Sequence, residues 1–155
     1  MKHALLFTFL ISSSLPVFSQ NNETINEITF KTGSRGGEKT IIIHPDSAFF
    51  ETIRRSAPSG TTKSKIKIKK SDWHKLITSI SKYKLIDLAG LASPTHLRES
   101  DGANFSTISI VTNKSRYDCG AFDDFNPNEK LSKLMKAIQK IEKMINNHLN
   151  SHPEK

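Results

Sequence analysis

The sequence has little cysteine: its 155 residues include one, Cys119. A single cysteine cannot form an internal disulfide, which excludes a small domain held together by such bonds. Tyr117, Cys119 and Ala121 alternate within RYDCGAF and are expected to share one face of a strand, so we predict a buried thiol. A reactive thiol is the alternative, and it would need a basic, accessible neighbourhood.

Long apolar runs are also absent beyond the first residues. The segment MKHALLFTFLISSSLPVFS has a short basic start at Lys2 and His3, followed by an apolar run at residues 4–11. The run is well short of the ~20 residues that a membrane-spanning helix needs. We therefore interpret residues 1–19 as a secretory signal peptide cleaved before Gln20, with a membrane anchor as the alternative, and we expect a periplasmic or secreted protein.

The motifs of common hydrolases, metal enzymes and nucleotide-binding proteins are missing. No serine stands in GxSxG, no histidine pair stands in HExxH, and GSRGG at 33–37 lacks the lysine of a phosphate-binding loop and suits a turn instead. We therefore expect no catalytic residue, metal or cofactor. The alternative is a small hydrolase that uses the polar loop 96–101. The groups available to it are His96, Arg98, Glu99 and Asp101.

Positive charge is plentiful, and the whole chain carries +8 at neutral pH. Its densest run is KSKIKIKK at 63–70, in which Ile66 and Ile68 are expected on one strand face and lysines on the other. Such lysines either protect an edge strand from pairing with a neighbouring molecule or bind an anionic surface. No aromatic residue interrupts the run, so nucleic acid is not expected. The anion-binding candidates are Lys63, Lys65, Lys67, Lys69 and Lys70.

The remaining pattern predicts an α+β fold: an antiparallel sheet of about five strands packed by two helices, in one domain at 20–147. Residues 148–155 form a polar tail that we expect to fray. The segment 47–55 is compatible with a strand or a helix, and its alternation favours a strand. The other strands are expected at 27–32, 39–43, 63–70, 104–112 and 116–122, and the helices from about 71 to 83 and from Pro127 to Asn147.

The stretch FDDFNPNEKL at 122–131 permits two interpretations. Asp124, Asn126 and Asn128 alternate as the oxygen ligands of a calcium loop do, but the sixth position of such a loop is glycine and here is Glu129. A helix start explains the residues better, with Asn126 as the N-cap and Pro127 at the first helical position. We therefore predict a capped helix and no calcium site.

The order of elements, with the motifs TIIIHPD, DGANFSTISIVT and YDCGAFDDFNPNEKL, resembles small uncharacterised exported α+β proteins of bacteria. The layout is also similar to that of emfourin-type protein inhibitors of metallopeptidases, whose Gly-Gly turn corresponds to Gly36 and Gly37. Glu38 stands where that family has an aromatic residue, so no inhibitory residue is carried over. Together these observations predict a non-catalytic binding or inhibitory module. Its partner would be an envelope or extracellular protein or an anionic polymer bound through Lys63–Lys70.

Overall fold

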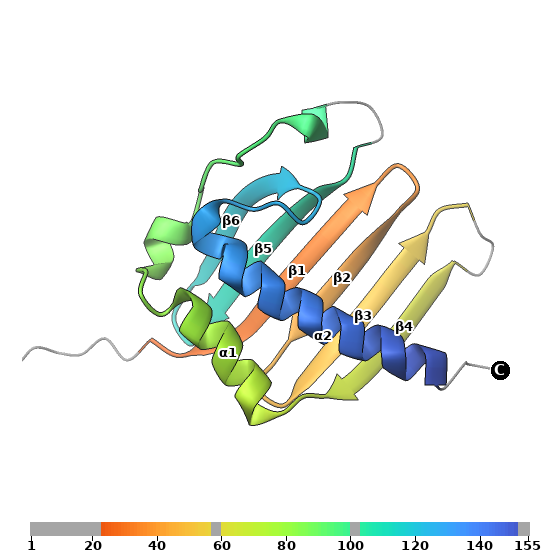
Figure 1. Cartoon of the computed structure of the whole chain (residues 1–155), viewed down its shortest axis with the longest axis horizontal. Helices are drawn as coiled ribbons and strands as arrows, with labels where there is room; N and C mark the ends of the chain where they lie inside the picture. The colour runs from red at the N-terminus through yellow and green to blue at the C-terminus, as the bar shows by residue number, and fades with distance from the viewer. Residues whose placement is uncertain (1–22, 57–59, 100–102, 152–155) are drawn as a thin grey trace, which may run out of the picture.

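The computed structural model describes residues 23–56, 60–99 and 103–151. The expected signal peptide and residues 152–155 of the expected tail lie outside this part of the chain. The fold is α+β, as predicted: one antiparallel sheet with two helices over the same face (Figure 1). The sheet has six strands rather than about five, in the order β4-β3-β2-β1-β5-β6. No helix of the described part is long and apolar enough to cross a membrane.

The strands are β1 (Ile25–Ser34), β2 (Gly37–Ile43), β3 (Ser47–Arg54), β4 (Thr61–Lys67), β5 (Phe105–Thr112) and β6 (Arg116–Asp123). The helices are α1 (Lys70–Ile80) and α2 (Ser132–Ser151), with 3-10 turns η1 (Leu85–Leu88), η2 (Leu97–Glu99) and η3 (Glu129–Leu131). Helix α2 therefore continues past the end expected at Asn147.

The Gly-rich stretch forms the turn between β1 and β2, as predicted. Ser34 pairs with Gly37, so the turn itself is two residues long. A side chain at Gly37 is excluded by neighbouring backbone, because its Cβ would lie 2.2 Å from the Ile53 carbonyl oxygen. This glycine lets β2 and β3 approach closely at the end of the hairpin.

The ambiguous segment 47–55 is a strand. In β3, Ala48 and Phe50 are buried and Phe49 is exposed, which is the alternation of a sheet with one covered face. Phe50 pairs with Ile41 of β2 and with Ser64 of β4. Strand β3 thus joins the lysine-rich β4 to the rest of the sheet.

A register irregularity in the β5–β6 pair changes one expected core position. Ile108 pairs with Cys119, but Ser106 pairs with Phe122, so one extra residue is accommodated on β6. As a result Phe122 is buried and Ala121 is exposed, although Ala121 was expected to share the face of Cys119. A β-bulge of this kind shifts the side-chain alternation by one residue.

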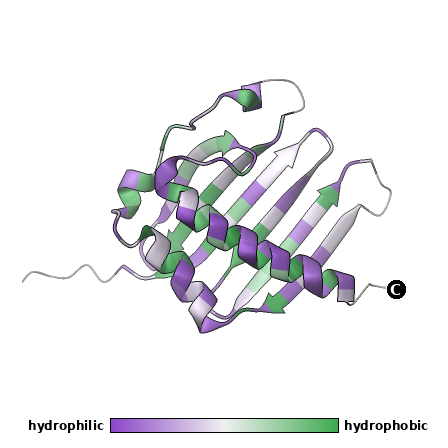
Figure 2. Cartoon of the chain, viewed as in Figure 1, coloured by the Kyte–Doolittle hydropathy of each residue, from purple (hydrophilic) through white to green (hydrophobic). Residues whose placement is uncertain are grey.

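The core lies between the sheet and the helices. Helix α2 alternates hydrophobic and hydrophilic residues along its length (Figure 2). Burying five apolar side chains of α2 contributes on the order of 10 kcal/mol before conformational entropy is subtracted. These side chains are Leu134, Met135, Ile138, Ile141 and Ile145. On the sheet they face residues such as Ile28, Phe30, Ile41, Ile43, Ile108 and Ile110.

Two ion pairs hold α2 in place. Lys140 donates to the carboxylate of Asp72 in α1 at 2.7 Å, and Lys39 of β2 pairs with Glu142. Asp72 is only 6% exposed. The hydrogen bond from Lys140, together with its charge, holds the pKa of the Asp72 carboxyl below its ordinary value although burial opposes ionisation. The lysines of α2 are exposed, and one of them, Lys140, connects the two helices.

The predicted N-cap at Asn126 is wrong. After β6 the backbone turns at Asp124, where φ is 47°, and the Asn126 amide then donates to the Asp123 carbonyl oxygen at 2.9 Å. The helical segment begins later, at η3. Its cap is Asn128, whose side-chain oxygen accepts from the Lys130 amide at 3.2 Å. The Asn128 side chain also donates to the Ala92 carbonyl oxygen at 3.1 Å, so it fastens the 92–99 loop to the start of η3.

We expect Asn128→Ala to lower the free energy of unfolding by about 1 kcal/mol, because a capping hydrogen bond and a loop contact are lost. Asn126→Ala is the matched control, since it removes the same side chain two positions earlier, and it should cost less. Urea unfolding of the two variants measures the difference. A larger loss for Asn126→Ala would contradict the assignment of the cap.

We expect Lys140→Met to lower the free energy of unfolding by about 1–2 kcal/mol at pH 7, because Asp72 loses its charged hydrogen-bond donor. The depressed pKa of Asp72 makes this contribution complete above the unfolded value of about 4 and progressively smaller as the pH falls through the folded value. The difference from the natural protein should therefore shrink in acid. Lys136→Met, at an exposed position of the same helix, should show neither effect in urea unfolding at each pH.

Candidate functional site

The five predicted anion-binding lysines lie at one edge of the sheet and are all exposed. Lys63, Lys65 and Lys67 belong to β4, and their side chains alternate with Ile66, which packs against the core. The lysines therefore point to the sheet face that no helix covers. Lys69 and Lys70 follow at the start of α1. We call these five residues the lysine cluster.

The lysines of the cluster differ in their partners. The Lys63 amine lies 2.9 Å from the Glu51 carboxylate, so its charge is partly compensated. The Lys65 amine lies 4.6 Å from the centre of the Phe49 ring, within the range of a cation–π contact. Among the described residues, no carboxylate forms an ion pair with the others. Lys65, Lys67, Lys69 and Lys70 thus have no ion-pair partner among the described residues, and the charge of Lys69 also acts on the Asp72 carboxylate.

An open groove of about 960 Å³ lies beside this end of the cluster. It separates the β3 and β4 ends from the start of α1. Ile68 and Trp73 give it an apolar surface. Trp73 is half-buried: it packs against the core and also lines the groove. The full lining is Pro45, Asp46, Ser47, Lys65, Lys67, Ile68, Lys70, Ser71, Trp73 and His74.

The five lysines that the sequence groups together lie near one another in the structure. The sequence does not indicate Trp73 or His74 as their neighbours. The signal available is the short distance along the chain between the strand and the helix that follows it. With β4 ending at Lys67 and α1 beginning at Lys70, the first turn of the helix must lie next to the end of the strand. Residues 45–47 also line the groove, and their place beside the lysines could be known only from the pairing of β3 with β4.

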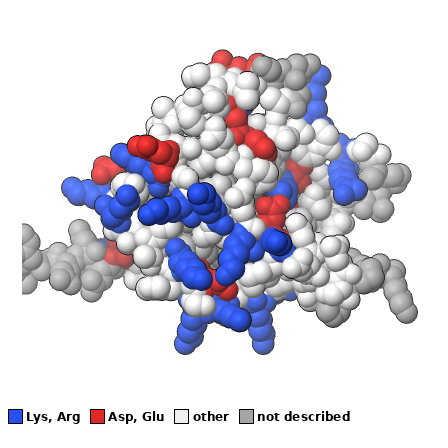
Figure 3. Space-filling view, in the orientation of Figure 1, with Lys and Arg blue, Asp and Glu red and all other residues white. Residues whose placement is uncertain are grey.

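Positive charge is not confined to the lysine cluster. Lysine and arginine side chains also gather over α1 and α2 on the helix-bearing face (Figure 3). Lys133, Lys136 and Lys143 are exposed on α2. They belong to the helix layer, on the opposite side of the sheet from the face to which Lys63, Lys65 and Lys67 point, and none of them lines the groove at Trp73. These three lysines therefore offer a comparison of equal charge for any three lysines of the cluster.

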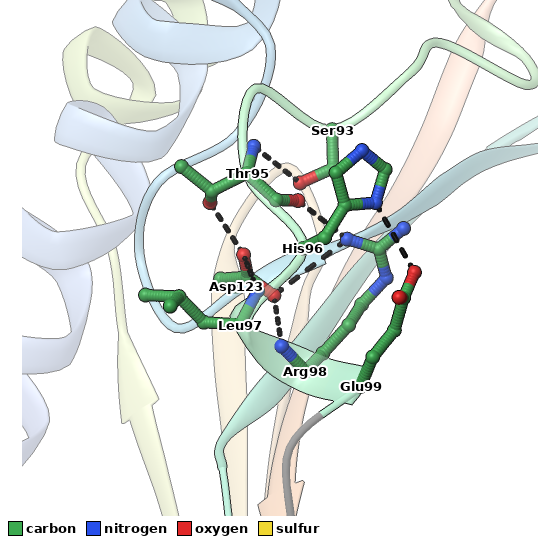
Figure 4. Close-up of polar contacts among 7 residues, drawn as sticks. All are labelled: Ser93, Thr95, His96, Leu97, Arg98, Glu99 and Asp123. Carbon is green, nitrogen blue, oxygen red and sulfur yellow. Dashed lines mark hydrogen bonds and ion pairs between the residues drawn. The ribbon is translucent and has the colours of Figure 1, made fainter.

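The alternative hydrolase loop has a different arrangement (Figure 4). The His96 ring lies 3.1 Å from the Glu99 carboxylate, and both side chains are about 70% exposed. Among the described residues, no hydroxyl or thiol group bonds with His96. Asp101 lies outside the described residues. The structure thus pairs His96 with a carboxylate but brings no nucleophile to it.

The buried acid of this region is Asp123, at the end of β6, which the sequence did not indicate. The residue is 4% exposed, and its side chain accepts hydrogen bonds from the Thr95 hydroxyl and from the amides of Leu97 at 2.8 Å and Arg98 at 2.7 Å (Figure 4). The Arg98 guanidinium lies 3.6 Å from the same carboxylate. Asp123 therefore anchors the loop 95–99 to the sheet.

The charge state of Asp123 fits this anchoring role. Burial opposes its ionisation, but the hydrogen bonds from Thr95 and from the Arg98 and Leu97 amides, with the Arg98 charge, hold the pKa of its carboxyl below the ordinary value. A carboxylate so engaged is not available as a general base for a substrate. Attachment to β6 thus accounts for Thr95 and Arg98, whereas His96 and Glu99 contact each other at the surface.

The single cysteine is buried, as predicted. Cys119 is 3% exposed, and burial, followed by the negative charge of Asp118, raises the pKa of its thiol to about 11. The thiolate that a nucleophile requires is therefore disfavoured at neutral pH.

Metal ligands do not converge anywhere in residues 23–56, 60–99 and 103–151: no three His, Cys, Asp or Glu side chains form a group that would hold an ion. In comparisons with known proteins, no protein-family model matches the sequence, and no curated protein matches it. The similarity of layout to emfourin-type inhibitors stays a prediction.

We expect Asp123→Asn to loosen the loop at residues 95–99, because a neutral amide cannot replace the acceptor of three hydrogen bonds beside Arg98. The free energy of unfolding should fall by about 1–3 kcal/mol, and the amides of Leu97 and Arg98 should exchange hydrogen faster. His96→Ala, in the same loop but exposed, should stay within about 0.5 kcal/mol of the natural protein. Equal losses in the two variants would contradict the anchoring role of Asp123.

Proposed function

We propose that this protein is an exported, non-catalytic binding or inhibitory module that docks an anionic partner on the lysine cluster. The observation that carries the proposal is that three lysines of the cluster, Lys65, Lys67 and Lys70, line one groove together with the half-buried ring of Trp73. An apolar surface bordered by several like charges suits a partner that supplies both negative charge and an apolar contact.

Edge protection alone accounts for only part of the cluster. Lysines on a sheet edge discourage pairing with a neighbouring molecule, and Lys63, Lys65 and Lys67 are placed to do so on β4. Lys69 and Lys70 lie beyond the strand, where there is no strand edge to protect. The groove lined by Trp73 is likewise not required for protection. These features favour a binding surface that includes the edge.

The partner classes proposed are an envelope or extracellular protein and an anionic surface polymer. Both carry negative charge, and both would be met by an exported protein. The long-range field of the cluster would raise the rate of encounter with either, and added salt would reduce that effect. The hydrolase alternative is weaker, because His96 contacts Glu99 but no hydroxyl or thiol group among the described residues.

We expect the variant Lys65→Gln/Lys67→Gln/Lys70→Gln to bind heparin, anionic vesicles or an acidic protein at least about tenfold more weakly than the natural protein, because three interacting charges are lost. The matched control is Lys133→Gln/Lys136→Gln/Lys143→Gln, which removes equal charge from α2 and should keep most of the affinity. The fluorescence of Trp73, the sole tryptophan, reports binding.

Two other outcomes of this titration would count against the proposal. Equal weakening of the two triple variants would show that net charge, and not the lysine cluster, governs binding. Suppose instead that the Lys65→Gln/Lys67→Gln/Lys70→Gln variant keeps its affinity but associates with itself as its concentration rises in sedimentation velocity. The lysines would then only protect the edge.

A further inference from the structure

The backbone hydrogen bonds of β4 have a defined direction. The Arg54 amide donates to the Gly60 carbonyl oxygen at 2.6 Å, and the Ile68 amide donates to the Asp46 carbonyl oxygen at 3.0 Å. Both bonds fit the antiparallel register in which Lys65 lies opposite Phe49. Because bonded and non-bonded pairs alternate in such a ladder, the even-numbered residues of β4 bond to β3. The amides and carbonyls of Thr61, Lys63, Lys65 and Lys67 therefore point away from the sheet.

The two edge strands of the sheet, β6 and β4, differ in what lies beside them. At β6, the chain between η1 and η2 passes close to the strand, and a side chain at Gly120 would lie 2.6 Å from the Leu91 carbonyl oxygen. At β4, the last strand on its side of the sheet, no described strand pairs with the outer side, and α2 crosses over the helix-bearing face of the strand and extends past it (Figure 1). The outward row of donors and acceptors on β4 is thus open to another chain.

We propose that β4 accepts an extended segment of a partner protein as a further strand, and that this segment carries acidic side chains at alternate positions. The inference rests on the proposed function, since it specifies the partner of the same surface. In an antiparallel pair, opposite side chains lie on the same face about 4.5–5.5 Å apart. Aspartate or glutamate residues opposite Lys63, Lys65 and Lys67 would lie within reach of ion pairs on the uncovered face.

Charge selects against a second copy of this chain. Two β4 strands paired edge to edge would bring lysine side chains against lysine side chains, and like charges in opposite positions destabilise a strand pair. A polymer or a lipid surface supplies negative charge but no row of amides and carbonyls to match the free edge. An extended acidic peptide supplies both, which is why the geometry favours it.

The groove extends this edge at the Lys67 end. Ile68 and Trp73 lie just past the strand, so an apolar side chain next to the acidic stretch would rest on them. The partner segment that the surface fits is therefore an extended run of alternating acidic and β-branched residues with an apolar residue at one end.

A synthetic peptide tests the proposal on the natural protein. We would titrate a nonapeptide in which glutamate alternates with valine and threonine and which ends in leucine, with a control of the same composition whose glutamates are contiguous. The alternating peptide should bind at least about fivefold more tightly by Trp73 fluorescence. At saturation, hydrogen exchange should slow at the amides of Thr61, Lys63, Lys65 and Lys67. Unchanged exchange at these amides would overturn strand addition.

A pair of variants separates the backbone contact from the charge. Lys65→Ser and Lys65→Pro both remove the lysine, but only proline also removes the outward amide, and it leaves the ladder to β3 intact because that amide does not bond to β3. Strand addition predicts a further loss of at least about fivefold in Lys65→Pro. Far-UV circular dichroism checks its folding, and the exchange measurement on the natural protein does not depend on it.

The outcomes distinguish strand addition at β4 from the more general docking of an anionic partner on the lysine cluster. If the two peptides bind equally and the two Lys65 variants behave alike, strand addition is wrong and docking by charge stands. The same conclusion follows if heparin or anionic vesicles bind and the peptides do not. If no anionic probe binds, the proposed function fails together with the inference.

Discussion

The rest of the structure depends on the burial of α2 against one face of the sheet. Side chains alternate between the two faces along a strand. When one face is covered by α2, every second side chain of each strand therefore lies on the opposite, uncovered face. On the covered face, Ile41 and Phe50 are buried and Ile66 packs against the core. On the uncovered face lie Lys63 and Lys65. The same alternation fixes which backbone groups of β4 face outward. The lysine cluster and its open edge are thus consequences of how the core forms.

The two buried carboxylates of the described residues, Asp72 and Asp123, have structural partners. Asp72 is bound by Lys140, and Asp123 by the loop 95–99, so each carboxylate connects two elements that the apolar contacts alone would not orient. Buried charges persist only where such partners are supplied. The lysines of β4 are different, because they lie in solvent and those nearest α1 lack carboxylate partners among the described residues. This contrast supports the proposal that β4 binds a partner, while the polar loop is anchored to the sheet.

Local periodicity made much of the fold predictable from the sequence. The alternation of KSKIKIKK placed Ile66 and the lysines on opposite faces, and the spacing of Ile138 and Ile141 placed them on the buried side of a helix. Contacts between distant residues were not predictable in this way. Lys140 and Asp72 are 68 residues apart, and no local pattern marks them as partners. The shift of the cap from Asn126 to Asn128 has the same origin, since a bridge back to β6 delays the helix. The groove at Trp73 could not be predicted either, because its lining depends on the pairing of β3 with β4.

The central claim is that the exposed edge and face at β4, and not the basic surface of the helices, form the binding surface. It is tested most directly by mapping amide chemical shifts on the isotope-labelled protein during a titration with polyglutamate at low salt. The account predicts that the shifted residues fall mainly in 45–49 and 61–74, and that the shifts fade as salt is added. Shifts centred on α2 at 133–143, or spread evenly over all lysines, would contradict it.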